Sequence, residues 1–363
     1  MQYTNYNYTQ YRPPYQQGYP LFQKSLQQLK KEREKSLLQK KSSGLGYYIL
    51  SYFLALNCIV IGVIIVTEVI LLLSGGYTMD STDLLEKLQK DIVNSPFSHS
   101  FQIFAAAAAA MVPGLIYLKL SKNHISDVIK VSSVKPVMLI LITLMGMGIA
   151  MVANIASDMV TSNFSLIGIE FNLDMDSSSS SVFTNVLYVI STALTPAFAE
   201  EFGFRGILMG TLRKYGDSFA IIVSAIMFGA MHGNIIQIPF AFILGLIFGY
   251  VDCKTNSIIP SIVIHFVNNF YAVILDILQS QGTVSNRTFA IINLSLFIAF
   301  LVLGVLAFLI IAKKDKNFLS ISDTSNVVSL SLKEKITAFF SGSGVIITVI
   351  LLALETVATL FVL

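Results

Sequence analysis

The chain has 363 residues, of which 54% are hydrophobic and 12% are charged, with a formal net charge of +3. This composition lies outside the range of soluble domains of this length and indicates a multipass membrane protein. The small net charge gives no reason to expect a nucleic-acid partner. Two cysteines, Cys58 and Cys253, are too few for a disulfide framework or a CxxC-type metal site, so we expect both to be packing residues.

The first 43 residues precede the first apolar run. Residues 1–20 are rich in Tyr, Gln, Asn and Pro, which predicts a disordered tail, and they contain no core of a secretory signal peptide. In the next stretch Phe22, Leu26 and Leu29 fall at helical spacing among many lysines. This pattern predicts a basic amphipathic helix, which either lies on an anionic membrane face or is simply solvated.

Apolar runs near the roughly 20 residues that cross a bilayer recur along the rest of the chain. Nine candidate spans cover residues 47–73, 102–120, 136–157, 182–204, 218–233, 236–251, 258–278, 289–312 and 343–363. Lys and Arg gather in the N-terminal tail and in loops 119–135, 205–217, 252–256 and 313–342, and Asp and Glu in loops 74–101 and 158–181. The positive-inside rule therefore predicts an all-α bundle of eight or nine spans with a cytoplasmic N-terminus.

Ionisable residues at membrane depth cost several kcal/mol, so they usually face a protein interior, a partner or a water-filled cavity. In this chain they cluster in three neighbouring spans. The members are Glu200, Glu201, Arg205, His232, His265 and, as a polar companion, Asn269. The two other histidines, His99 and His124, are expected in polar surface loops.

The two adjacent glutamates have different geometric relations to the arginine. Glu201 and Arg205 are four residues apart on one helix, with the acid first, which favours an ion pair. Glu200 is rotated by about 100° from Glu201 and is left without this partner. Pro196 frees the backbone carbonyl of Thr192, which predicts a kink that admits water. Glu200 in such a place suits a general base.

His265 and Asn269 are also four residues apart and project from one helix face. A neutral imidazole N–H beside an amide NH₂ makes a donor pair for a developing oxyanion. His232, from another helix, could hold a water molecule against Glu200. Together these residues supply the parts for hydrolysis of an amide by water.

Other interpretations use the same polar cluster. Taken singly, a Glu–Arg pair or a histidine in a span more often packs helices together or belongs to an ion path. A metal site, with zinc as the example, would take Glu200, His232 and His265 as ligands. The histidines are 33 positions apart and HExxH is absent, so the spacing permits a metal without arguing for one. The expected cofactor is therefore none or one divalent metal.

Three motifs occur in order on these spans: EExxxR at residues 200–205, FxxxH at 228–232 and HxxxN at 265–269. In these motifs the chain resembles the CPBP family of intramembrane proteases, named for CAAX proteases and bacteriocin-processing enzymes and also called Abi. The resemblance covers about residues 182–275.

The resemblance implies a role for each motif residue. Glu200 would be the catalytic base with His232 as its partner, and His265 and Asn269 would stabilise the oxyanion. Glu201 and Arg205 would support the site structurally. Family members have been described as metalloproteases and as glutamate proteases, and some act as immunity factors or scaffolds.

The predicted organisation has four parts. Residues 1–43 form the cytoplasmic tail and basic helix, 44–181 three N-terminal transmembrane helices, 182–279 the CPBP-like catalytic core, and 280–363 the C-terminal transmembrane helices. With these boundaries His232 lies about 14 residues into its span, roughly 21 Å from the inner face. It can meet Glu200 only if that span is tilted or begins deeper.

The predicted function is an intramembrane endopeptidase of the cell membrane, in which glutamate-activated water cleaves prenylated CAAX-type or other membrane-associated peptides. Its partners would be such a peptide or prenylated protein and membrane lipids, with no nucleic acid. The alternative is a proton-coupled transporter, or a non-catalytic scaffold or immunity protein, that uses the same cluster.

Overall fold

The structure is a computed structural model of the chain and describes residues 25–73, 95–166, 181–282, 284–320 and 329–362. These residues form helices and turns, and their only β-type pairing is an isolated bridge between Val131 and Ser257. The all-α, polytopic fold predicted from the sequence is confirmed. The predicted disordered tail, residues 1–20, lies outside the described residues.

The described helices have these bounds in chain order. They are α1 (Leu26–Leu73), α3 (Pro96–Ser121), α4 (Ile125–Val128), α5 (Pro136–Leu166), α6 (Val182–Val189), η2 (Ile190–Leu194), α7 (Thr195–Glu201), η3 (Phe202–Met209), α8 (Gly210–Leu212), η4 (Arg213–Tyr215), α9 (Asp217–Ala230), α10 (Gln237–Thr255), α11 (Ile259–Ser280), α12 (Asn286–Lys314), η5 (Lys316–Leu319), α13 (Leu332–Phe340) and α14 (Ser343–Val362). The segments from α6 to η4 follow one another without a break, so that Val182–Tyr215 is one long helix.

Seven of the described helices are long and apolar enough to cross a membrane. They correspond to the predicted spans from residue 102 onward, except that α9 has only 14 residues and is too short by this measure. The first predicted span, 47–73, is the second half of α1. The largest boundary error is in the fourth span, because the helix continues to Tyr215 where a loop was predicted from residue 205.

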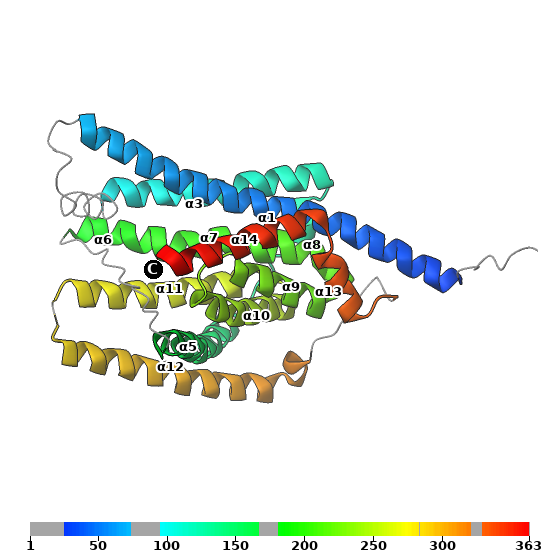
Figure 1. Cartoon of the computed structure of the whole chain (residues 1–363). Helices are drawn as coiled ribbons and strands as arrows, with labels where there is room; N and C mark the ends of the chain where they lie inside the picture. The colour runs from blue at the N-terminus through cyan, green and yellow to red at the C-terminus, as the bar shows by residue number, and fades with distance from the viewer. Residues whose placement is uncertain (1–24, 74–94, 167–180, 283, 321–328, 363) are drawn as a thin grey trace, which may run out of the picture.

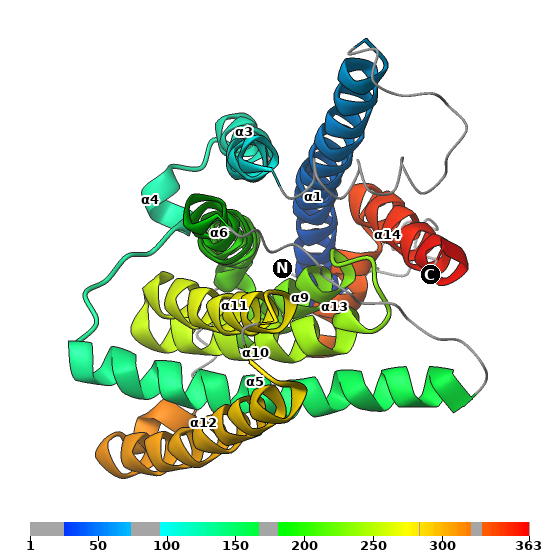
Figure 2. The same cartoon turned by 90° about the vertical axis from the view of Figure 1, so that its left-hand side faces the viewer.

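The helices lie in layers around a central group (Figures 1 and 2). On one side α12 packs against α5, and α5 packs against α10 and α11. On the other side α1 packs against α3, α13 and α14. The long Val182–Tyr215 helix, α9, α10 and α11 lie between these two groups, and together with the turn after α9 they carry all seven motif residues. The polar cluster is therefore held in the middle of the bundle.

The predicted basic helix is not a separate element. It is the first part of α1, whose 48 residues make one continuous helix about 72 Å long at 1.5 Å per residue. Figure 1 shows this part of α1 extending past the end of the bundle beside α13. There Lys31 Nζ lies 2.6 Å from Glu334 Oε1 of α13, and Leu38 is fully buried. The basic segment is thus attached to the C-terminal part of the protein.

Candidate active site

The helix that carries the two glutamates changes its winding just before them. Ile190–Leu194 is π-helical, and the Thr195 hydroxyl donates to the carbonyl of Ile190 at 2.8 Å. Pro196, which lacks a backbone N–H, follows at once. The carbonyl of Thr192, predicted to lose its helical partner, instead accepts the side-chain Nδ2 of Asn269 at 3.4 Å. Single π-turns of this kind often mark functional sites.

Glu201 is the hub of a buried charge network. Its Oε2 lies 3.1 Å from Nε of Arg205, and both side chains are completely buried. The predicted ion pair is therefore present. Its other oxygen, Oε1, lies 3.0 Å from Nδ1 of His265 on α11. One carboxylate thus joins the first motif to the third, a link that helix geometry on a single span could not reveal.

Aromatic rings enclose the arginine. The Arg205 guanidinium carbon lies 4.3 Å from the ring centre of Phe228 and 5.0 Å from that of Phe248. Such cation–π contacts stabilise a cation that is removed from water. Phe248 also stacks on His265, with ring centres 5.4 Å apart. Phe228, the first residue of the second motif, therefore positions Arg205, and Phe248 is a supporting residue that the motifs did not include.

Glu200, His232, His265 and Asn269 line one cavity of about 70 Å³. Glu200 Oε2 is shielded from solvent, has no hydrogen-bond partner in the described part of the chain and lies 3.9 Å from His265 Nε2. A cavity of this size has room for a few water molecules. The remaining lining comes from Phe228, Phe240, Ala241, Leu244, Phe248 and Asn268.

The depth of His232 follows from the true end of the preceding helix. The helix of Glu200 and the helix before His232 meet at the turn of Gly216. Glu200 lies 16 residues before Gly216 (216 − 200) and His232 lies 16 residues after it (232 − 216). Equal chain lengths on either side of the turn bring the two residues to the same depth. The mismatch expected from the sequence arose because the first helix was ended too early.

The ring atoms of both histidines have distinct partners. Nδ1 of His232 lies 2.9 Å from the carbonyl of Phe228, so this nitrogen carries the proton and Nε2 is left as an acceptor in the neutral ring. Nδ1 of His265 faces the Glu201 carboxylate, so it too carries a proton. A neutral His265 then has no N–H at Nε2. His265 can donate toward Glu200 and the cavity only as an imidazolium, which differs from the neutral donor expected from the sequence.

Asn269 is positioned by two neighbours. Its Nδ2 donates to the Thr192 carbonyl, and its Oδ1 accepts from Nδ2 of Asn268 at 3.2 Å. With the oxygen occupied in this way, the amide NH₂ is fixed toward the π-helical turn. Asn268, which the third motif does not include, is thereby a further residue of the site.

Residues 182–271 match the family described as type II CAAX prenyl endopeptidase Rce1-like. Over these residues the chain is similar to the Rce1-like group of the CPBP family. This Rce1-like segment spans about a quarter of the chain, from the start of α6 to the middle of α11, and it includes all seven motif residues. No curated protein and no solved structure matches the chain. The match supports a CAAX-type endopeptidase, in general terms, in an integral membrane protein.

Within the Rce1-like segment, sequence reasoning missed Asp252. This residue was assigned to a positively charged loop, but α10 continues past it and its side chain is 2% exposed. Its carboxylate accepts from the backbone N–H and the hydroxyl of Ser261, at 3.1 and 2.6 Å, in the first turn of α11. Asp252 therefore ties α10 to the start of the helix that carries His265. The sequence did contain a signal for Asp252. It is a single acidic residue that follows an apolar run and precedes Pro260, which marks the start of the next helix.

His99 and Glu355 are ionisable residues outside the Rce1-like segment that have buried polar atoms. His99, expected in a surface loop, is 2% exposed on α3, where its Nδ1 lies 3.3 Å from the Ser191 hydroxyl. The sequence Ser95-Pro96 caps and starts this helix and was the overlooked signal. Glu355 on α14 has a buried Oε2 with no hydrogen-bond partner among the described residues. This oxygen lies 2.7 Å from the position that a Cβ of Gly233, the neighbour of His232, would occupy.

The residues of the Rce1-like segment do not fit a metal site as they are placed. Among the described residues, no three His, Cys, Asp or Glu side chains are grouped so that they could hold a metal ion. This applies to the expected set of Glu200, His232 and His265. Since His265 Nδ1 is bound to Glu201, Nε2, which lies 3.9 Å from Glu200 Oε2, is the ring nitrogen that a metal would have to use.

Proposed function

We propose that the protein is an intramembrane endopeptidase of the CAAX type that uses Glu200 to activate water. The observation that carries this proposal is the meeting of four polar residues from three helical segments at one small cavity. Among these residues Glu200 offers a buried carboxylate oxygen without a partner. An unpaired acceptor at membrane depth costs stability, and its retention is accounted for if the oxygen binds the attacking water.

The chemical step needs a base and a route for one proton. Glu200 takes a proton from water as the water oxygen bonds to the carbonyl carbon of the scissile peptide. The proton is then passed from Glu200 to the amide nitrogen as the carbon–nitrogen bond breaks. His232 accepts through Nε2 a hydrogen bond from the same water, because its Nδ1 is held by the Phe228 carbonyl.

The negative charge that develops on the carbonyl oxygen requires donors. Asn269 offers its NH₂ group, and His265 offers Nε2–H when its ring is protonated. Glu201 would hold the ring by Nδ1, and Arg205 would hold Glu201.

The substrate is proposed to be a membrane-associated peptide, such as a prenylated CAAX tail, cleaved in the plasma membrane. The cavity has room for water but not for a peptide, so the substrate must enter by separating helices next to the cavity. Phe240, Ala241 and Leu244 of α10 form its apolar wall and are the proposed place of this separation.

The proposed function is tested by comparing Glu200→Gln with Glu201→Gln in the purified full-length protein, with a prenylated CAAX peptide as the substrate. Glu200→Gln should keep the fold and lose at least about a hundredfold in kcat, because a general base contributes about 10² to 10⁴. Glu201→Gln should also lose stability, since a broken buried ion pair costs about 3–5 kcal/mol. Helix content by circular dichroism and the midpoint of unfolding separate the two effects.

Full cleavage by a well-folded Glu200→Gln variant would rule out this mechanism. A chelator added to the same assay tests the metal. Because the described side chains do not fit a metal ion, we expect cleavage to continue after chelation.

A further inference from the structure

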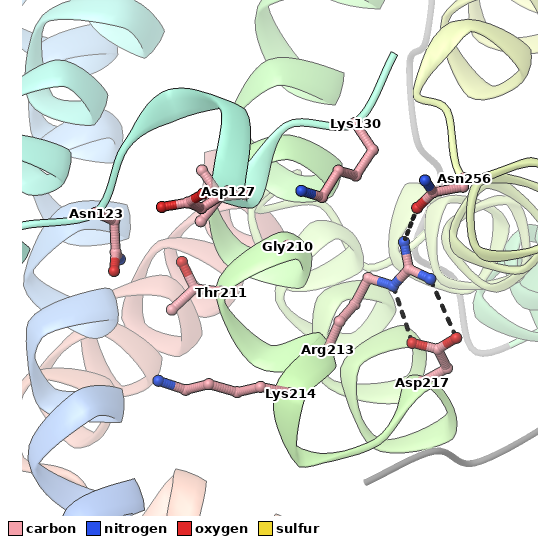
Figure 3. A pocket seen from close by; sticks show the side chains of 10 residues that line it. Asn123, Asp127, Lys130, Gly210, Thr211, Arg213, Lys214, Asp217 and Asn256 are labelled. Atoms are coloured by element: carbon pink, nitrogen blue, oxygen red, sulfur yellow. Dashed lines mark hydrogen bonds and ion pairs between the residues drawn. The ribbon is translucent and has the colours of Figure 1, made fainter. Parts of the chain in front are cut away.

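A second polar cavity lies at the far end of the glutamate-bearing helix (Figure 3). Its volume is about 390 Å³, several times that of the catalytic cavity. Its walls come from the loop around α4, from the last turns of the long helix, and from the turn between α10 and α11. The lining residues are Asn123, Asp127, Val128, Lys130, Gly210, Thr211, Arg213, Lys214, Asp217 and Asn256.

Backbone contacts build this cavity. Gly210 has no room for a side chain, since a Cβ there would collide with the carbonyl of Val128. On the other side, the backbone N–H of Ile258 donates to the carbonyl of Lys130 at 2.9 Å. These contacts fix the α4 loop against the long helix and against the start of α11. The cavity is therefore a part of the packed structure.

The cations of the cavity differ in how far they are neutralised. Arg213 is fully engaged, with two bonds to the Asp217 carboxylate at 2.9 and 3.2 Å and one to Asn256 Oδ1 at 3.1 Å. The Lys130 ammonium donates a hydrogen bond to the backbone carbonyl of Ser126, a neutral group that does not balance the positive charge. No ion pair to Lys130 or Lys214 is found among the described residues. The ammonium groups of Lys130 and Lys214 are therefore available to bind an anion.

A further lysine adds to the positive charge at this end of the bundle. Lys41 of α1 has its pKa lowered by burial and, in second place, by repulsion from Lys214. Two ammonium groups that repel each other are stabilised when an anion lies near them. The negative charge that opposes these lysines is that of Asp127, whose side chain is exposed at the rim of the cavity.

Two buried groups in the cavity wall can donate hydrogen bonds. Asn123 Nδ2 is shielded from solvent and has no hydrogen-bond partner among the described residues. The Thr211 hydroxyl is on a side chain that is only 4% exposed and interacts with the Tyr117 hydroxyl. Figure 3 shows both side chains at the side of the cavity toward which the Lys130 and Lys214 ammonium groups extend. Asn123 Nδ2 can only donate a hydrogen bond, so the group that satisfies it must accept, and the Thr211 hydroxyl can donate to the same group. A phosphate has several anionic acceptor oxygens and meets this need.

We propose that this cavity binds the phosphate of an anionic phospholipid headgroup. Basic pockets between the ends of transmembrane helices are suited to headgroups, and the loops that form this pocket belong to the positively charged face predicted to be cytoplasmic. The Asp127 carboxylate at the rim can accept hydrogen bonds from the hydroxyl groups of a glycerol headgroup. Among anionic phospholipids, phosphatidylglycerol therefore matches the cavity best. The headgroup would clamp the α4 loop and the start of α11 to the long helix.

The carboxylate of a CAAX-type substrate is a poorer match. Arg213 follows Glu200 by 13 residues on the same helix, which is roughly 20 Å. The three residues after the CAAX cysteine span at most roughly 10 Å. The cavity lies beyond the reach of a tail cleaved at Glu200, and its proposed ligand does not depend on the protease function.

The test measures lipid binding to the full-length protein in detergent by native mass spectrometry. Phosphatidylglycerol, phosphatidylcholine and inorganic phosphate are the probes. A double variant, Lys130→Gln with Lys214→Gln, should bind phosphatidylglycerol about tenfold more weakly or worse, since each lysine near a membrane surface contributes about 1 kcal/mol. The control, Lys313→Gln with Lys314→Gln, removes two lysines from the end of α12, away from the cavity, and should bind as the unaltered protein does.

Thr211→Val keeps the shape of the side chain, removes its hydroxyl, and guards against a double variant that fails to fold. It should also weaken phosphatidylglycerol binding, and phosphatidylcholine should bind weakly to all variants. Equal affinity of the lysine variants for phosphatidylglycerol, or loss of binding only in the α12 control, would overturn the proposal. Inorganic phosphate that binds as tightly as the lipid would overturn the headgroup as the ligand.

Discussion

Gly233 links the turn of His232 to the C-terminal helix. It has a positive φ of 59°, a conformation that costs residues with a side chain about 1–2 kcal/mol. Its missing side chain also leaves room for the Glu355 carboxylate, which would stand 2.7 Å from a Cβ. The position therefore demands glycine for two separate reasons, and each can be measured.

Gly233→Ala should destabilise the protein by more than the backbone cost alone and should lower kcat, because the clash with Glu355 shifts the turn that holds His232. Gly282→Ala is the matched control, since Gly282 has the same φ of 59° and nothing within 4 Å of its Cβ position. Thermal unfolding and cleavage of a CAAX peptide measure the two effects. Equal losses in both variants would show that Glu355 does not constrain the turn.

Helices α5 and α12 meet at a pair of glycines. A Cβ at Gly148 would lie 2.9 Å from the Cα of Gly304, so the two backbones nearly touch. Figure 1 looks along α5 and shows α12 from the side, so that the helices cross steeply. Small residues at such crossings let dispersion forces act between backbones, which is the main attraction between helices in lipid.

Gly148→Ala should separate α5 from α12 and lower the free energy of unfolding by about 1–3 kcal/mol, as overpacking usually does. Gly62→Ala in α1 is the control, because nothing lies within 4 Å of its Cβ position. Since alanine favours a helix over glycine by about 1 kcal/mol, this control should be neutral or stabilising. The fraction folded in a titration with sodium dodecyl sulfate measures both. A Gly148→Ala protein as stable as the control would contradict the crossing described above.

At the scale of the whole molecule, the proposed site depends on helices beyond the Rce1-like segment. The Thr359 hydroxyl of α14 has two acceptors within hydrogen-bond distance, the carbonyl of Gly233 at 3.0 Å and the carbonyl of Thr356 in its own helix at 2.9 Å. The first of these links α14 to the turn after His232 from outside residues 182–271. Thr356 lies one turn away, and its hydroxyl donates only to Leu352 within its own helix. Both hydroxyls thus have an acceptor within α14, and the contact with Gly233 is what distinguishes Thr359 from Thr356.

Thr359→Val should lower kcat several-fold with little change in stability, because a single hydrogen bond contributes about 1 kcal/mol. Thr356→Val should leave kcat unchanged. Cleavage assays of both variants, with circular dichroism as a check on folding, provide the measurement. The C-terminal helix would have no part in catalysis if the two variants cleaved equally well.

The sequence by itself determined the helical membrane fold, most of the spans and the composition of the polar cluster. Local periodicity and the high cost of charge in lipid are properties that a single segment already carries. The ion pair of Glu201 with Arg205 was predictable because both residues lie on one helix at fixed spacing. The end of that helix was not, since Arg205 and the charges after it were taken as a loop, and the depth of His232 was misjudged as a consequence.

Only the tertiary structure decided which residues meet across helices. The bond from Glu201 to His265, the use of the Thr192 carbonyl by Asn269, and the approach of Glu355 to Gly233 join positions 64, 77 and 122 residues apart (265 − 201, 269 − 192 and 355 − 233). Such contacts depend on how helices are rotated and how deep they sit, and one segment's periodicity does not specify either. For the same reason the protonated nitrogen of His265, on which its proposed role depends, could be assigned only after its partner on another helix was known.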